Sequence, residues 1–109
     1  MMYDIFITHA WGTDSLNRDN HLRCKKLCDL LKNKGYIVWF DHYNLIGNID
    51  KSIINGINKS KIIILCLTKL YCGKINKAIY NESYNDNCYK EWNYILFKKK
   101  KNNSIINGT

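Results

Sequence analysis

Glu91 is the residue whose type and position most directly suggest chemistry. It is one of only nine carboxylates in a chain of 109 residues with a net charge of +8. It stands one turn into a predicted helix, directly after a long polar segment. A carboxylate there can stabilise positive charge that develops on a substrate, or hold the hydroxyl groups of a sugar, as in glycosidases. The alternative is a structural role, in which Glu91 complements the helix dipole.

Asp41 is the second carboxylate of interest. It follows a hydrophobic strand and opens a loop that runs from Asp41 to Gly47, here called the 41–47 loop. In a parallel sheet such loops meet at the carboxyl edge of the strands, where folds of this kind bind ligands. The alternative for Asp41 is that it caps backbone N–H groups of its own loop. Gly47 is expected to serve a turn with unusual backbone angles.

A short loop after the first predicted strand should line the same crevice. It begins with His9, Ala10 and Trp11. The indole of Trp11 can stack on a planar ligand ring, or it can be a partly buried packing residue, and the sequence leaves both readings open. Trp39 and Trp92 fit apolar stripes and are expected in the core instead.

No metal site or disulfide framework is predicted. An odd number of cysteines, no Cys-x-x-Cys pair and apolar neighbours argue against both. Cys24 and Cys28 lie four residues apart on one helix face and are interpreted as small core residues. His21 and His42 have no partner at ligand spacing, so no role is assigned to them.

Composition narrows the class of protein. The length predicts one domain, residues 1–109. The lysines are spread along the chain apart from one cluster at residues 98–101, so nucleic acid is an unlikely partner and a lysine-rich solvated surface is the simpler interpretation.

No apolar run reaches the roughly 18 residues of a membrane span, and the N-terminus lacks the features of a secretion signal, so a soluble cytoplasmic protein is expected.

The order of predicted elements is strand, helix, strand, helix, strand, helix, strand. Apolar runs predict strands at residues 3–8, 36–40 and 61–67, and the start of a fourth at 104–106. One helix is predicted from Asp19 or Asn20 to Lys34, and a second begins after a cap at Asn48. A third is predicted to begin near Asp86 or Asn87 and to run into the lysine cluster. Residues 68–85 are expected to form a long polar connection. This alternation predicts an α/β fold, a three-layer parallel sheet with right-handed crossovers.

The chain resembles a Toll/interleukin-1 receptor (TIR) domain of the type found in bacteria, protists and large viruses. Residues 3–9, 39–47, 56–60 and 86–91 carry the resemblance, in the family's order and spacing. It implies a flavodoxin-like topology. The family fold normally continues through a completed fourth strand, a fifth strand and two further helices, so the chain is expected to be a single TIR domain, incomplete at the C-terminus and truncated after the start of the fourth strand.

Many TIR domains hydrolyse NAD+ at the bond between nicotinamide and ribose, in signalling or defence such as innate immunity. The resemblance implies that Glu91 is the catalytic residue and that His9, Ala10, Trp11, Asp41 and Gly47 bind the substrate. Nicotinamide leaves as a neutral molecule, so one carboxylate can suffice. There is no Gly-x-Gly-x-x-Gly or Walker loop, so NAD+ would be a substrate and no retained cofactor is expected.

Two other functions are compatible with the resemblance. The first is a non-enzymatic module that associates with itself or with other TIR domains through the 41–47 loop. The second is an inactive, truncated remnant of an enzyme.

Overall fold

A parallel β-sheet forms the centre of the molecule. The computed structural model describes residues 2–80, 87–99 and 105–107. The strands are β1 (Tyr3–His9), β2 (Val38–Trp39), β3 (Ser60–Cys66) and β4 (Ile105–Asn107), in the spatial order β2-β1-β3-β4. All pairs are parallel, and β1 lies between its two partners with Ile5 opposite both Val38 and Ile62. This order matches the first four positions of the flavodoxin-like order 2-1-3-4-5.

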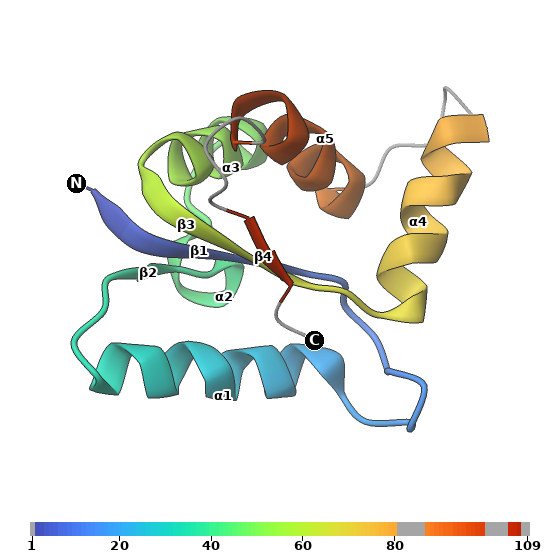
Figure 1. Cartoon of the computed structure of the whole chain (residues 1–109), viewed down its shortest axis with the longest axis horizontal. Helices are drawn as coiled ribbons and strands as arrows, with labels where there is room; N and C mark the ends of the chain where they lie inside the picture. Colours follow the sequence, from blue (N-terminus) through green and yellow to red (C-terminus); the bar gives the residue numbers. More distant parts are fainter. Residues whose placement is uncertain (1, 81–86, 100–104, 108–109) are drawn as a thin grey trace.

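Helices cover both faces of the sheet, as predicted. The helix α1 (Asn20–Asn33) lies on one face, and α3 (Ile49–Asn58) and α5 (Asn87–Lys99) lie on the other (Figure 1). The helix α4 (Lys69–Tyr80) stands beyond the carboxyl ends of β1 and β3 (Figure 1). The short helix α2 (Asp41–Asn44) follows β2 directly. No helix in the described part of the chain has the length and apolarity needed to cross a membrane.

Alternating residues of β1 supply two separate cores, because successive strand side chains point to opposite faces. On the α1 face, Ile5 and Ile7 pack with Cys24 and Cys28 of α1, which confirms the prediction that these cysteines are core residues. On the other face, Phe6 belongs to a second cluster. Its partners from the other elements are Trp39, Ile53, Ile57, Ile63, Leu65 and Ile95.

Trp39 and Gly56 show how closely the second core is packed. The Trp39 indole stacks on the Phe6 ring at 4.5 Å between ring centres, and Trp39 is buried as predicted. A Cβ at Gly56 would lie 2.7 Å from the indole nitrogen of Trp39. Glycine at position 56 therefore allows α3 to approach the sheet.

The prediction of a long connection at residues 68–85 was wrong, because α4 occupies most of that segment. The hydroxyl Oγ1 of Thr68 accepts a hydrogen bond of 3.2 Å from the backbone N–H of Tyr71, which satisfies a free donor of the first turn. Tyr71 and Ile75 lie one turn apart and bury their side chains against Ala10 and Cys88. Among the α4 side chains that the structure describes, these two are the buried apolar ones, and the polar residues between them weaken the periodic pattern in the sequence.

Other boundaries also differ from the predictions. The strand predicted at residues 36–40 is reduced to β2, because Tyr36 and Ile37 are 48% and 46% exposed. The 41–47 loop contains α2, and His9 ends β1 instead of starting a loop. Of the isoleucines of α3, Ile53 and Ile57 are buried, whereas Ile49 and Ile54 are 43% and 39% exposed. Residues 81–86, 100–104 and 108–109 lie outside the described residues, so parts of the predicted connection, lysine cluster and fourth strand remain expectations.

Candidate active site

A cleft of about 230 Å³ opens at the carboxyl edge of the sheet, between the end of β1, the start of α2 and the first turns of α5. Its lining contains Glu91 and four of the five residues predicted to bind substrate, namely His9, Ala10, Trp11 and Asp41. The complete lining is His9, Ala10, Trp11, Asp41, His42, Leu45, Ile53, Lys74, Cys88 and Glu91. Segments from both halves of the chain thus meet in one small concave site.

Glu91 lies in the second turn of α5 and is only 7% exposed. The buried Cys88 precedes it by three residues, on the same face of the helix, and packs against Ala10 at the end of β1. This packing brings the carboxylate to the rim of the sheet. Lys74 of α4 lines the same cleft and is the cationic side chain among the lining residues.

Asp41 and Trp11 connect the first two loops of the site. The Trp11 indole Nε1–H donates a hydrogen bond of 3.1 Å to Oδ2 of Asp41. The other oxygen, Oδ1, is buried and accepts no hydrogen bond from the described residues. The alternative of a capping role for Asp41 finds no support here, because no described backbone N–H donates to its carboxylate. Trp11 itself is 55% exposed, so part of its ring is accessible to a ligand.

Three histidines form a connected row behind Trp11, which the sequence analysis missed. The nitrogens Nε2 of His9 and Nδ1 of His21 lie 2.7 Å apart, and Nε2 of His21 lies 3.3 Å from Nδ1 of His42. The Trp11 ring stacks on His21 with 3.5 Å between ring centres. The prediction that His21 and His42 have no partner at ligand spacing was wrong, because the residues come from different elements and only the fold brings them together.

Burial keeps the inner histidines uncharged. It lowers the pKa of His9 to about 4, against the opposing effect of the Asp41 carboxylate and with a smaller lowering effect of His21. Burial also lowers the pKa of His21, again opposed by Asp41. Both imidazoles are therefore neutral at physiological pH, and each retains a nitrogen lone pair.

Gly47 is absent from the lining of the cleft. Its φ angle is +66°, in the left-handed region, which agrees with the predicted turn of unusual backbone angles. The turn leads into α3, whose cap residue Asn48 accepts a hydrogen bond of 3.0 Å from the backbone N–H of Lys51. In this structure Gly47 shapes the 41–47 loop, and its assignment to substrate binding stays a prediction.

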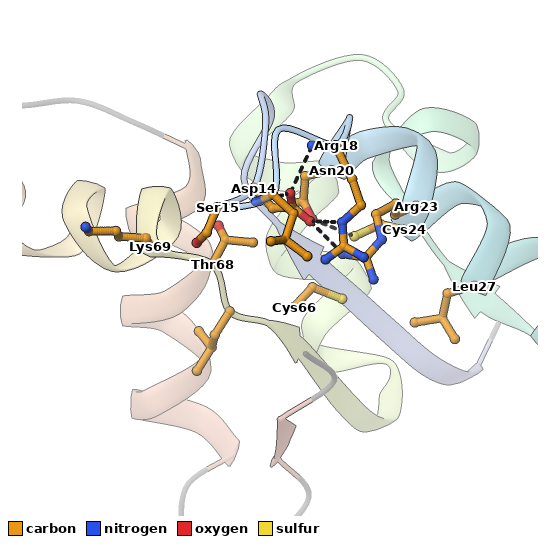
Figure 2. A pocket seen from close by; sticks show the side chains of 12 residues that line it. Asp14, Ser15, Arg18, Asn20, Arg23, Cys24, Leu27, Cys66, Thr68 and Lys69 are labelled. Atoms are coloured by element: carbon orange, nitrogen blue, oxygen red, sulfur yellow. Dashed lines mark hydrogen bonds and ion pairs between the residues drawn. The ribbon is translucent and has the colours of Figure 1, made fainter.

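A larger cleft of about 570 Å³ lies between the start of α1 and the end of β3 (Figure 2). Its two arginines, Arg18 and Arg23, are directed at Asp14, whose Oδ2 accepts from them at 2.7 and 2.8 Å (Figure 2). The single Asp14 carboxylate therefore offsets part of their positive charge. Glu91 does not line this cleft, so the smaller one is the better candidate for catalysis.

Comparison with known proteins identifies the class of protein. The chain matches the TIR domain family over residues 5–107 and therefore belongs to that family. One curated relative is a protein named NAD(+) hydrolase TcpA, from Theionarchaea archaeon (strain DG-70-1). It is 36% identical over 74 residues, which cover 66% of this chain and 21% of the relative. The chain thus spans about a fifth of the length of that relative. No solved structure matched significantly.

Proposed function

We propose that this TIR domain hydrolyses NAD+ at the bond between nicotinamide and ribose, with Glu91 as the catalytic carboxylate. The observation that carries the proposal is the shared cleft, in which Glu91 lies with His9, Ala10, Trp11 and Asp41. The name of the archaeal relative supports the choice of substrate.

The chemistry requires stabilisation of positive charge on the ribose. As the bond between the nicotinamide nitrogen and the anomeric carbon breaks, its electron pair goes to the nicotinamide ring, which leaves as a neutral molecule. A water oxygen then bonds to the anomeric carbon and releases one proton. The carboxylate of Glu91 stabilises the cationic ribose, and its burial at 7% exposure strengthens this interaction because fewer water molecules screen it.

The size of the cleft indicates which part of NAD+ it receives. Ligand sites commonly have volumes of about 300–1,000 Å³. At about 230 Å³ the cleft lies below this range, so we expect it to receive the nicotinamide and its ribose and not the whole dinucleotide. The exposed part of the Trp11 ring offers a stacking surface for nicotinamide or adenine beside the cleft.

An incubation of the purified chain with about millimolar NAD+, a typical upper value for enzyme KM, tests the proposal by measuring free nicotinamide. Glu91→Gln should abolish turnover, because the amide keeps the shape of the side chain but not its charge. Glu82→Gln is the matched control, since Glu82 is the only other glutamate of the chain, and should retain turnover. Absence of turnover in a folded, concentrated wild-type sample would refute the proposed NAD+ hydrolysis.

A second candidate function is a non-enzymatic module that associates through the 41–47 loop. The observation that favours it is the exposure of apolar side chains in this loop. Ile46 is 76% exposed and Leu45 is 38% exposed. Association that persists in Glu91→Gln, without any turnover in the wild type, would support this function over the hydrolase.

A further inference from the structure

Two histidines and one aspartate gather in a cluster that the proposed hydrolysis does not use as a unit. His9 ends β1, His21 is the second residue of α1, and Asp41 is the first residue of α2. Each offers one atom that can bind a metal ion, and these atoms all lie within 4.8 Å of one another. Both histidines are buried. Their positions on three different elements anchor the cluster to the framework of the fold.

The carboxylate of Asp41 carries an unsatisfied atom. Its Oδ2 accepts the hydrogen bond from Trp11, whereas its Oδ1 is buried without a partner among the described residues. A buried polar atom without a hydrogen bond is costly, and more so when it belongs to a charged group. A cation bound at Oδ1 would remove this cost, which is an independent indication of a ligand at this place.

We propose that His9, His21 and Asp41 form a binding site for a divalent transition metal of the zinc type. Two imidazole nitrogens and one carboxylate oxygen are ligands that zinc, cobalt and nickel accept, whereas magnesium and calcium require sites made of oxygen. Three protein ligands leave at least one coordination position for water or another small ligand.

The adjustment needed to bind a metal is small. Zinc binds nitrogen and carboxylate oxygen at about 2.0–2.2 Å, so its ligand atoms lie roughly 3.3 Å apart in a tetrahedron. The 2.7 Å between Nε2 of His9 and Nδ1 of His21 would open slightly, and the other separations, which reach at most 4.8 Å, would close.

The surroundings hold these ligands as metal sites usually require. A ligating histidine commonly uses its second nitrogen in a hydrogen bond, and a ligating carboxylate is itself hydrogen-bonded. When Nδ1 of His21 binds the metal, its Nε2 remains beside His42 at 3.3 Å. The Trp11 indole N–H orients the carboxylate of Asp41. His42 and Trp11 are thus positioning residues for the site.

Titration of the metal-free 109-residue chain with Co²⁺, in the absence of NAD+, tests the inference. A saturable visible absorption band at one equivalent is expected, and Zn²⁺ should displace the Co²⁺ while Mg²⁺ should not. The failure of this experiment is distinguishable from failure of the hydrolase, because it measures binding alone.

Variants then assign the ligands. His21→Ala and Asp41→Asn should each weaken Co²⁺ binding by at least about 100-fold, and His42→Ala by only about 10-fold, as expected for outer-shell partners. Cys72→Ser is the matched control for binding by a surface thiol, because Cys72 is the exposed cysteine, and should leave the affinity unchanged. A circular dichroism spectrum and a thermal unfolding curve verify that each variant is folded.

Two results would overturn the inference. One is the absence of saturable Co²⁺ binding to folded wild-type protein. The other is an affinity that His21→Ala and Asp41→Asn leave unchanged in their folded form. Since Asp41→Asn preserves the size of the side chain, it keeps the test decisive if removal of the buried His21 ring prevents folding.

Discussion

The indole nitrogen of Trp11 donates a hydrogen bond of 3.1 Å to Oδ2 of Asp41, across 30 residues of sequence. The bond joins the loop after β1 to the start of α2. It therefore ties together the two loops that line the cleft of Glu91. An exposed tryptophan with a fixed partner is pre-organised for binding, because its ring is already held in one orientation and binding a ligand costs less conformational entropy.

The Trp11→Phe substitution removes this hydrogen bond and keeps an aromatic ring. Because a net hydrogen bond contributes about 0.5–1.5 kcal/mol, and more when one partner is charged, we expect KM for NAD+ to rise several-fold. The change in kcat should be smaller, since Glu91 is untouched. Steady-state kinetics of nicotinamide release measure both constants. A fall in kcat with unchanged KM would contradict the positioning role of Trp11.

Gly56→Ala should destabilise the fold. The added Cβ would lie 2.7 Å from the Trp39 indole nitrogen, and overpacking of this kind costs about 1–3 kcal/mol. The better helix propensity of alanine offsets up to about 1 kcal/mol of that loss. We therefore expect the midpoint of thermal unfolding to fall by several degrees.

Gly73→Ala is the matched control for Gly56→Ala. Gly73 lies within α4, and a Cβ there would have no neighbour within 4 Å among the described residues outside the backbone of its own helix and its two chain neighbours. Here the helix propensity acts alone, so the free energy of unfolding should rise by up to about 1 kcal/mol. Equal effects of the two substitutions would contradict the close contact between α3 and Trp39.

Asp14 is expected to contribute stability that is lost in acid. The backbone N–H of Arg18 is the largest cause that lowers the pKa of Asp14, and the backbone N–H of Leu16 and the Arg18 guanidinium act in the same direction. A carboxyl group whose pKa is lower in the folded than in the unfolded state stabilises the fold above its unfolded pKa. That contribution disappears as the pH falls through the folded pKa.

Thermal unfolding of the wild type and Asp14→Asn, from about pH 6 to about pH 2, measures this contribution. At the upper end the wild type should be the more stable protein. The difference should shrink below the ordinary pKa of aspartate. A difference that is independent of pH would mean that the Asp14 charge contributes nothing and that only its shape matters.

Ile46→Ser tests the 41–47 loop as an association surface. Ile46 is 76% exposed, so its replacement should not disturb the core, but it should weaken self-association by removing apolar area from the contact. Analytical ultracentrifugation over a range of concentrations measures the association constant. Phe97→Ser is the matched control, because Phe97 is 79% exposed and lies on α5 outside this loop. Equal effects of both substitutions would exclude a specific role of the loop.

Local patterns of the sequence predict the core of the fold. The apolar runs at residues 3–8 and 61–67 correspond to β1 and β3, and Cys24 and Cys28 lie on the buried face of α1 as expected. Hydrophobic periodicity carries this information because a strand or helix must bury one side wherever it packs. The weaker pattern of α4 was missed, since its helix depends on a few contacts of Tyr71 and Ile75 with residues distant in sequence.

The sequence by itself determined the alternation of strands and helices and the residue types available at the carboxyl edge of the sheet. The types and positions of Glu91, Asp41 and Trp11 marked them as candidates, and the chain belongs to the TIR domain family that its motifs resemble. Only the tertiary structure decided that His21 lies 2.7 Å from His9. The distances between side chains on different elements depend on how the elements pack, and no spacing along the chain encodes them directly.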